Sequence, residues 1–286
     1  MPYFSIIIPT YNRASIIGRA INAVLDQSFD DVEIIVVDDG STDQTSAVVG
    51  SIISPKLTYI YQQNKGVCAA RNLGASKATG KYLLFYDSDD LLLPTALLDF
   101  KNANFDDGAD LLFGDVEKKV LNKKASTIIK SSNPYGNNKG TGLYLAGSFC
   151  IATSFFEKLG GYDENIRFGE NTELRFRIDL LKPKKVFTNS IVLKYEVSSD
   201  GGSANLMNKI ISNQYMMKKH GYYFNQYPKV KQMYFQNNAI AYFQMKQYRK
   251  AILENIKAWY SYPKNIKTAA RTFLMCFPFI YNKRLH

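Results

Sequence analysis

Short apolar segments alternate with helical patterns through the first hundred residues, and this alternation limits the possible folds more than any other feature. The predicted strands are Phe4–Pro9, Val32–Asp38, Leu57–Tyr61 and Lys81–Asp87. They are apolar almost throughout, as expected for parallel strands that are covered on both faces. Repeated strand–helix units of this size predict a doubly wound α/β domain, with a mostly parallel sheet and helices on both faces.

Capping and stop signals place the other elements. We expect helices over 14–25, from a cap at 41–43 to about Ile53, over 67–78 with Gly80 as the stop, and from Pro94 onward. Further along, the pattern predicts a strand over 110–120, a mobile loop rich in Asn, Lys, Ser and Gly over 122–142, a helix over 168–181 and a strand or hairpin over 186–197.

The composition changes near residue 205, where the α/β pattern gives way to helical segments rich in Tyr, Phe, Lys and Gln. We therefore expect an α/β domain over 1–205 and a helical appendage over 206–286. The appendage holds 14 Lys and Arg against one acid, whereas residues 1–205 are almost neutral. Its basic charge suits an anionic membrane surface, nucleic acid, or an acidic protein or glycan.

The cysteines and the hydropathy pattern indicate a cytoplasmic protein. Cys68, Cys150 and Cys276 are odd in number and widely spaced, which argues against a disulfide framework or a cysteine-based zinc site. No secretory signal is evident, and no apolar run reaches the roughly 18 residues that a spanning helix needs. Neither GxGxxG nor GxxxxGK[ST] occurs, which disfavours a dehydrogenase or a P-loop enzyme.

Polar turns follow all four predicted strands. They are Pro9-Thr10-Tyr11-Asn12-Arg13, Asp38-Asp39-Gly40-Ser41, the segment from Asn64 to Arg71, and Asp87-Ser88-Asp89-Asp90. The carboxyl ends of parallel strands lie at one edge of a sheet, where ligands of such folds bind. The sequence therefore predicts that these four turns share one crevice.

The last of these turns places three carboxylates within four residues. Their mutual repulsion would be relieved by a hard divalent cation, and Mg²⁺ or Mn²⁺ favours one or two carboxylates together with substrate phosphates. Simpler interpretations exist for each turn. Asp87–Asp90 could be a helix cap with acids near the helix dipole, Asp38–Ser41 an ordinary turn and cap, and Arg71 a solvated charge on a helix.

Three segments together resemble the family 2 inverting glycosyltransferases of the GT-A fold: SIIIPTYNR, DQSFDDVEIIVVDDGSTD and NKGVCAARNLGASKATGKYLLFYDSDD. The resemblance covers about residues 3–205. It implies that a nucleoside-diphosphate sugar, most often a UDP-sugar, is the co-substrate and that Mn²⁺ or Mg²⁺ assists. By resemblance, Thr10, Tyr11 and Asp39 would hold the nucleobase, and Arg13 and Arg71 would lie near the base or diphosphate. Asp87 would approach the ribose and the metal, and Asp89 would bind the metal. The donor site would be completed by Pro9, Asn64 and Ser88.

The acceptor side departs from the family pattern. Members of the family usually carry Glu-Asp within a segment like GGYDENIRFGENTELRFRI, and the Asp acts as general base; this chain has Glu170-Asn171. An amide has no basic site at neutral pH. We therefore expect Glu170 to be the base, with Asp163, Glu164 and Glu173 as the other nearby acids. The alternative is that Glu170 is an exposed acid at a helix start.

A second departure is the loop at 195–203. Relatives often place a histidine there, near the metal or diphosphate, whereas this chain offers only Asp200 or Ser203. The two histidines, His220 and His286, are out of register, and we expect both to be surface residues.

The resemblance implies an inverting, metal-assisted single displacement that forms a β-linkage to a hydroxyl of a glycan or lipid-linked acceptor. Because of Asn171, a catalytically weak or inactive sugar-nucleotide-binding protein is the alternative. A nucleotidyltransferase shares the α/β layout, but its glycine-rich loop after the first strand is missing.

The appendage includes one segment, 234–265, that resembles a tetratricopeptide-like helical hairpin, and a single copy is too short to form a solenoid. Residues 269–286 alternate apolar and basic side chains. They could lie on the inner face of the cell membrane or form an ordinary packing helix. No RNA-binding motif is present, so we expect no nucleic-acid partner.

Overall fold

The computed structural model describes residues 1–120, 125–133, 142–197 and 205–265. The chain divides into two compact units. The first, here called the α/β unit, comprises residues 1–164 and 170–198; the second, the helical unit, comprises residues 165–169 and 199–286.

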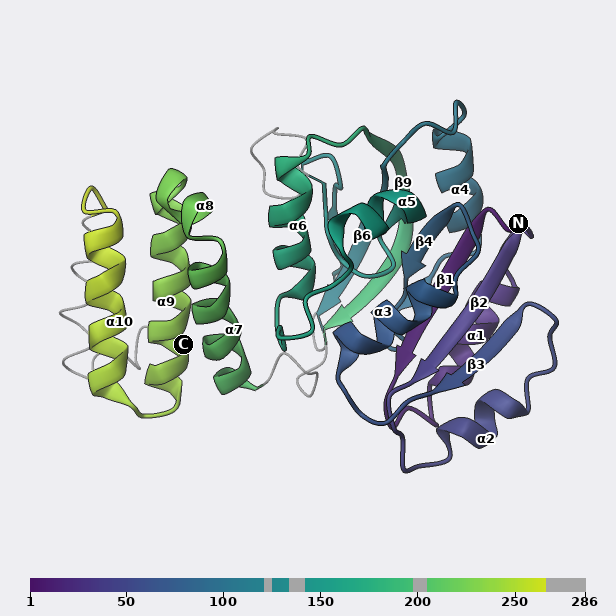
Figure 1. Ribbon diagram of the computed structural model, residues 1–286, viewed down its shortest axis with the longest axis horizontal. Helices are drawn as coiled ribbons and strands as arrows, with labels where there is room; N and C mark the ends of the chain where they lie inside the picture. The colour runs from purple at the N-terminus through teal and green to yellow at the C-terminus, as the bar shows by residue number, and fades with distance from the viewer. Residues whose placement is uncertain (121–124, 134–141, 198–204, 266–286) are drawn as a thin grey trace. The chain divides into compact units, whose positions relative to one another are not determined.

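Among the described residues, a nine-stranded sheet forms the centre of the α/β unit, with the order β3-β2-β1-β4-β8-β6-β9-β5 and β7 beside β6 (Figure 1). The strands are β1 (Phe4–Thr10), β2 (Val32–Asp38), β3 (Leu57–Tyr61), β4 (Tyr82–Phe85), β5 (Leu91–Leu92), β6 (Leu111–Val120), β7 (Thr127–Ile129), β8 (Phe149–Ala152) and β9 (Lys185–Val197). The first four strands in sequence are mutually parallel, as predicted. Beyond β4 the sheet is mixed, because β8 runs antiparallel to both β4 and β6.

Helices cover both faces of this sheet. They are α1 (Ile17–Leu25), α2 (Thr45–Gly50), α3 (Val67–Lys77), α4 (Ala96–Ala103), α5 (Thr153–Leu159) and α6 (Glu170–Leu180). Successive side chains of a strand point to opposite faces, and β1 shows this directly. Ile6 and Ile8 belong to the hydrophobic cluster that contains α1 and α4, whereas Ile7 belongs to the cluster that contains α5 and α6.

Some predicted bounds need correction. The predicted loop over 122–142 contains a strand, β7, which pairs antiparallel with β6, and β9 is one strand. The helix after the second strand ends at Gly50, three residues before the predicted end, and its N-cap Gln44 makes no side-chain capping bond.

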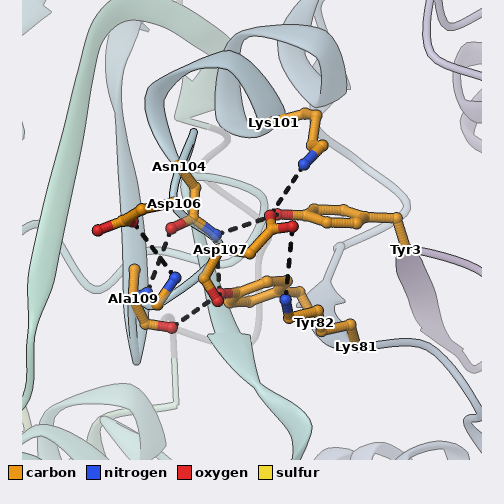
Figure 2. A network of polar contacts seen from close by, with 9 residues as sticks. Tyr3, Lys81, Tyr82, Lys101, Asn104, Asp106, Asp107 and Ala109 are labelled. Atoms are coloured by element: carbon orange, nitrogen blue, oxygen red, sulfur yellow. Dashed lines mark hydrogen bonds and ion pairs between the residues drawn. The ribbon is translucent and has the colours of Figure 1, made fainter.

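The amino-terminal ends of β1 and β4 are fastened by a polar network (Figure 2). The Asn104 amide donates to the hydroxyls of Tyr3 and Tyr82, at 3.0 and 2.7 Å, and its oxygen accepts from the Ala109 amide. Asp107 in turn accepts from the Tyr3 hydroxyl and from Lys101. Asn104 is fully buried, so this network ties α4 to the edge of the sheet opposite the strand ends described below.

The helical unit contains α7 (Leu206–Lys219), α8 (Gly221–Gln226), α9 (Pro228–Gln244) and α10 (Tyr248–Ser261). A buried polar chain links three of them: the Asn213 amide donates to Asn238 at 2.9 Å, and the Asn238 amide donates to Glu254 at 3.2 Å. Segment 165–169 also belongs to this unit, where the Ser212 hydroxyl accepts from the main-chain amides of Arg167 and Phe168.

His220 corrects one expectation. It is only 3% exposed, so the prediction of a surface histidine was wrong. The residue lies at the junction of α7 and α8, where its carbonyl accepts from the amides of Tyr223 and Phe224. His286 lies outside the described residues.

Several predictions fall on residues that the structure does not describe: Asp200 and Ser203, the membrane-contact segment 269–286, and Cys276. Within the described part of the chain, every helix is too short or too polar to cross a membrane.

Candidate functional site

The carboxyl ends of the parallel strands meet at one edge, as predicted. Thr10 at the end of β1 pairs with Asp38 at the end of β2, and Asp38 pairs with Tyr61 at the end of β3. Strand β4 is also parallel to β1, with Ile7 opposite Phe85. The four polar turns therefore leave the sheet on the same side.

Pro9 explains why the turn of residues 87–90, here called the acidic turn, leaves the sheet early. The Tyr86 amide donates to the Ile7 carbonyl, so the odd-numbered residues of β1 face β4. The next donor on that side would be residue 9, but proline has no amide hydrogen. The hydrogen bonds between β1 and β4 therefore end here, and the chain from Asp87 onward leaves β1 at the carboxyl ends of the strands.

The first turn combines a buried hydroxyl with exposed side chains. Thr10 is 3% exposed, and its Oγ1 has no hydrogen-bond partner among the described residues. Tyr11 is 48% exposed and Arg13 is also exposed. Such an arrangement offers an aromatic ring and a cation to a ligand beside a strand end.

Asp39 is buried and heavily bonded. Its Oδ1 accepts from Gln62 at 2.6 Å and from the Lys65 amide at 2.8 Å, and its Oδ2 accepts from the Gly66 amide at 2.8 Å. The carboxylate thus holds the turn between β3 and α3. A carboxylate retains further acceptor capacity beyond three bonds, so Asp39 remains a candidate for contacting a nucleobase.

Gly40 allows the second and third turns to approach each other. It adopts a left-handed φ of +83°, and a Cβ on this residue would lie 2.8 Å from the Asn64 amide nitrogen. A side chain here would therefore be strained and would collide with the main chain. The simple interpretation of a local turn holds for Asp38, whose Oδ1 accepts from the Ser41 amide at 2.7 Å.

The acidic turn forms a compact cluster. Oxygen atoms of Asp87, Asp89 and Asp90 all lie within 4.8 Å of one another. Asp89 is exposed, Asp87 partly exposed, and Asp90 is buried, as is Ser88. The interpretation as a helix cap is wrong, because the cluster is followed by strand β5 and α4 begins only at Ala96. Hard carboxylate oxygens at this spacing suit Mg²⁺ or Mn²⁺, so the residues fit the expected metal, with Asp87 and Asp89 as the accessible ligands.

Three residues that the sequence did not single out surround this cluster. Arg19 of α1 donates to the Asp89 carbonyl at 3.1 Å, and the Tyr86 hydroxyl donates to the Asp90 carbonyl at 3.0 Å. Burial and the nearby acidic cluster raise the pKa of Tyr195 on β9. Tyr86 directly precedes the cluster in the sequence, whereas Arg19 and Tyr195 carry no motif and reach it only through the fold.

Arg71 is the central cation of the site. Its Nη2 donates to Asp87 at 2.7 Å and its Nη1 donates to Glu170 at 2.9 Å, while the residue is only 1% exposed. The interpretation as a solvated helix charge is therefore wrong. Burial alone would lower the pKa of the guanidinium, but Asp87 and Glu170 raise it well above its usual value. Arg71 thus stays charged and joins the acidic turn to the start of α6.

Glu170 is the first residue of α6. Its side chain is 19% exposed and bound to Arg71, so the alternative of a freely exposed helix-start acid does not hold. Oε1 carries the Arg71 bond, and within the described part of the chain no donor reaches Oε2. A carboxylate oxygen is therefore left beside the acidic turn.

Asn171 is held by a neighbour. Its Oδ1 accepts from the buried Tyr162 hydroxyl at 2.8 Å. The Arg71 guanidinium lies 5.3 Å from the centre of the Tyr162 ring, within the range of a cation–π contact. Burial raises the pKa of the Tyr162 hydroxyl, so this residue acts as a neutral donor and fixes the amide.

The family model for glycosyl transferase family 2 matches residues 5–157, which is more than half of the chain. The chain belongs to glycosyltransferase family 2. The matched region contains the four strand-end turns and Arg71, and it ends before Glu170.

Curated relatives carry glycosyltransferase names. An uncharacterized glycosyltransferase of Rickettsia conorii is 30% identical over 219 residues, covering 71% of this chain and 35% of the relative. A GalNAc(5)-diNAcBac-PP-undecaprenol beta-1,3-glucosyltransferase of Campylobacter jejuni is 28% identical over 287 residues, covering 91% of this chain and 86% of the relative. The chain spans only about a third to just under three fifths of the length of the first relatives that it matches.

Solved structures agree on the fold. TarS residues 1–349 of S. aureus, in complex with UDP-GlcNAc, superpose with a TM-score of 0.63 at 17% identity, covering 99% of this chain and 91% of that one. At this identity the likeness establishes the GT-A fold, including a helical region at the C-terminal side, and no more.

Proposed function

We propose that the chain is an inverting glycosyltransferase that moves a sugar from a UDP-sugar to a hydroxyl of a glycan or glycolipid acceptor. The observation that carries the proposal is the double ion pair of Arg71. One buried guanidinium joins Asp87, on the donor side of the site, to Glu170, the candidate base. Membership of the family and the meeting of the four turns support the same assignment.

The donor would lie along the strand ends. Tyr11 offers an exposed ring for a nucleobase, and the unpartnered Thr10 hydroxyl and the Asp39 carboxylate lie in the adjoining turns. Pro9 and Asn64 shape these turns, and Arg13 supplies an exposed cation near the base or diphosphate. The S. aureus TarS structure is a complex with UDP-GlcNAc, which supports a UDP-sugar as the first donor to test.

The diphosphate would lie at the acidic turn. Asp87 and Asp89 would hold a divalent cation, which would supply positive charge to offset that of the departing diphosphate. Ser88 lies between these two residues, and Arg71 keeps Asp87 in place through its bond of 2.7 Å.

Glu170 would remove the acceptor proton. The acceptor oxygen attacks the anomeric carbon, the bond to the diphosphate oxygen breaks, and Oε2 of Glu170 takes the hydroxyl proton. A single displacement on an α-linked donor inverts the configuration and gives a β-linkage. Asn171 has no basic site and its oxygen already accepts from Tyr162, so the adjacent carboxylate is the group that can act.

A donor screen tests the proposal. UDP-, GDP- and dTDP-sugars are offered with Mn²⁺, and binding is measured by calorimetry and donor hydrolysis by release of the nucleotide. We expect a UDP-sugar to bind and to be hydrolysed slowly without acceptor. If none of these nucleotides binds, the proposal is overturned.

A catalytically weak or inactive sugar-nucleotide-binding protein is the second candidate, favoured by Asn171. Glu170→Gln and Asn171→Asp separate the two. A general base contributes roughly 10²–10⁴ in rate, so Glu170→Gln should lower transfer by that factor while UDP binding persists. If Asn171→Asp alone creates transfer in an otherwise inactive protein, the second candidate is correct.

The setting is also a proposal. The Campylobacter jejuni relative is named for an undecaprenol-linked glycan, which supports a lipid-linked glycan acceptor and polysaccharide biosynthesis at the inner face of the cell membrane. We propose that residues 206–286 form a domain separate from residues 1–205. The basic charge of this domain would favour an anionic membrane surface over a nucleic acid.

A further inference from the structure

The turn that carries Tyr11 and Arg13 is held by side chains from the neighbouring turn. Three successive main-chain amides each donate to a different side chain: Asn12 to Ser41 Oγ at 2.8 Å, Arg13 to Thr45 Oγ1 at 2.9 Å, and Ala14 to Asp43 Oδ2 at 3.1 Å. We call Ser41, Asp43 and Thr45 the amide clamp.

Asp43 and Thr45 act as one unit within this clamp. The Thr45 hydroxyl donates to Asp43 Oδ1 at 2.5 Å and accepts from the Arg13 amide, and Asp43 Oδ1 also accepts from the Thr45 amide at 3.0 Å. Thr45 is fully buried, so its hydroxyl is kept from water and stays bonded to Asp43 and to the Arg13 amide. The bond from Thr45 also lowers the pKa of Asp43.

Apart from the clamp, the described residues fix this turn mainly through the Arg13 carbonyl, which accepts from the amides of Ile16 and Ile17. Asn12 adopts a left-handed φ of 52°, which is uncommon for a residue other than glycine. The side chains of Tyr11, Asn12 and Arg13 are exposed, and the core begins again only at Ile17. Asn12 adds one reciprocal bond, since its Oδ1 accepts from the Thr42 amide at 2.8 Å.

We propose that Asp43 and Thr45 are positioning residues that set the orientation of Tyr11 and thereby the affinity for the nucleoside end of the donor. Neither residue needs to touch the donor. They fix the main chain that directly follows the exposed ring, at Arg13 and Ala14, so that less of the ring's freedom has to be lost when the ligand binds. This inference rests on the proposed function, because it assumes a nucleotide ligand at these strand ends.

The test compares two probes that occupy different ends of the site. UDP with Mn²⁺ requires both the nucleoside end and the acidic turn, whereas inorganic pyrophosphate with Mn²⁺ requires only the acidic turn. Both are titrated by calorimetry into the full chain, into Asp43→Ala, and into Asp26→Ala as a charge-matched control. Asp26 is exposed at the end of α1 and makes no side-chain hydrogen bond that the structure shows.

We expect Asp43→Ala to weaken UDP binding about tenfold, since the cost of ordering one side chain on binding is of the order of a tenfold change in affinity. Pyrophosphate binding should be unchanged, and Asp26→Ala should bind both probes normally. Thr45→Val should behave like Asp43→Ala, whereas Thr45→Ser keeps the hydroxyl and should restore UDP binding.

Each other outcome is decisive. Equal UDP affinity in Asp43→Ala and the unmodified chain overturns the inference, and so does a parallel loss of both probes, which would indicate general loss of folding. If the unmodified chain binds pyrophosphate with Mn²⁺ but no nucleotide, the proposed function fails, and the clamp inference fails with it.

Discussion

Arg71 and Glu170 are joined by an ion pair of 2.9 Å although 99 positions separate them in the sequence. Arg71 lies on α3, packed beneath the strand ends, and Glu170 begins α6. The same guanidinium holds Asp87 through its other nitrogen, so these two carboxylates share one cation. The positive charge of Arg71 thus balances the carboxylates of Asp87 and Glu170, which are both only partly exposed to water.

The first prediction concerns this cation. Arg71→Met removes the shared partner, and loss of one member of a buried pair typically costs about 3–5 kcal/mol; because Asp87 and Glu170 are partly exposed, we expect about 3 kcal/mol of lost stability. Chemical denaturation followed by circular dichroism measures it.

Arg71→Lys is the sharper variant. An ammonium is a single point of charge and cannot span both carboxylates as the planar guanidinium does. We therefore expect the fold to persist while turnover falls more than UDP affinity. Lys77→Arg, an exposed swap on the same helix, serves as the control. Full turnover in Arg71→Lys would show that the double ion pair is not needed.

The site illustrates what the sequence could and could not predict. Apolar runs with polar ends predicted β2 and β3 to the residue, because a covered parallel strand leaves a strong signal. Once these strands are taken as parallel and adjacent, it follows that their turns lie together, namely residues 9–13, 38–41, 64–71 and 87–90. The pairing of Arg71 with Glu170 was not predictable, since it depends on how β8 and α6 return to the sheet.

Predictions made from the local sequence were wrong where tertiary packing decides burial or strand pairing. His220 looked like a surface residue because its neighbours in sequence are lysines and tyrosines, but the α7–α8 junction buries it. Strand β7 was missed because its three residues lie within a polar segment, and only pairing with β6 makes them a strand. Arg19 and Tyr195 carry no motif, and their place beside the acidic turn follows from the fold alone.

A second prediction concerns the metal. Asp89 is the most exposed member of the acidic cluster, so Asp89→Asn removes a charged ligand without leaving a buried group unpaired. We expect Mn²⁺ affinity, measured by the electron paramagnetic resonance of free Mn²⁺, to fall about tenfold or more, since hard cations favour charged oxygen ligands. Asp26→Asn should leave the affinity unchanged. Equal Mn²⁺ binding in Asp89→Asn would remove Asp89 from the set of ligands.

A third prediction concerns the network at the opposite edge of the sheet. Asn104→Ala leaves the Tyr3 and Tyr82 hydroxyls without their donor and the buried Ala109 amide without its acceptor. A buried group without a partner costs about 1–3 kcal/mol, and we expect a loss of stability within that range by urea denaturation. Asn102→Ala, an exposed change on the same helix, should have little effect. UDP binding should be unchanged, because the network lies at the amino-terminal ends of the strands.

The last prediction is a pH dependence in the same network. Hydrogen bonds from Lys101 and from the Tyr3 hydroxyl lower the pKa of Asp107 in the folded protein. A carboxyl whose folded pKa is depressed stabilises the fold above its unfolded pKa of about 3.9, and this contribution is lost as the pH falls through the folded value. The difference in free energy of unfolding between the unmodified chain and Asp107→Asn should therefore be constant from about pH 5.5 to pH 7 and should shrink below about pH 4. Asp26→Asn should show no such change with pH, because Asp26 lacks these bonds. If the difference for Asp107→Asn stays constant down to pH 3, the Lys101 and Tyr3 bonds do not favour the charged form.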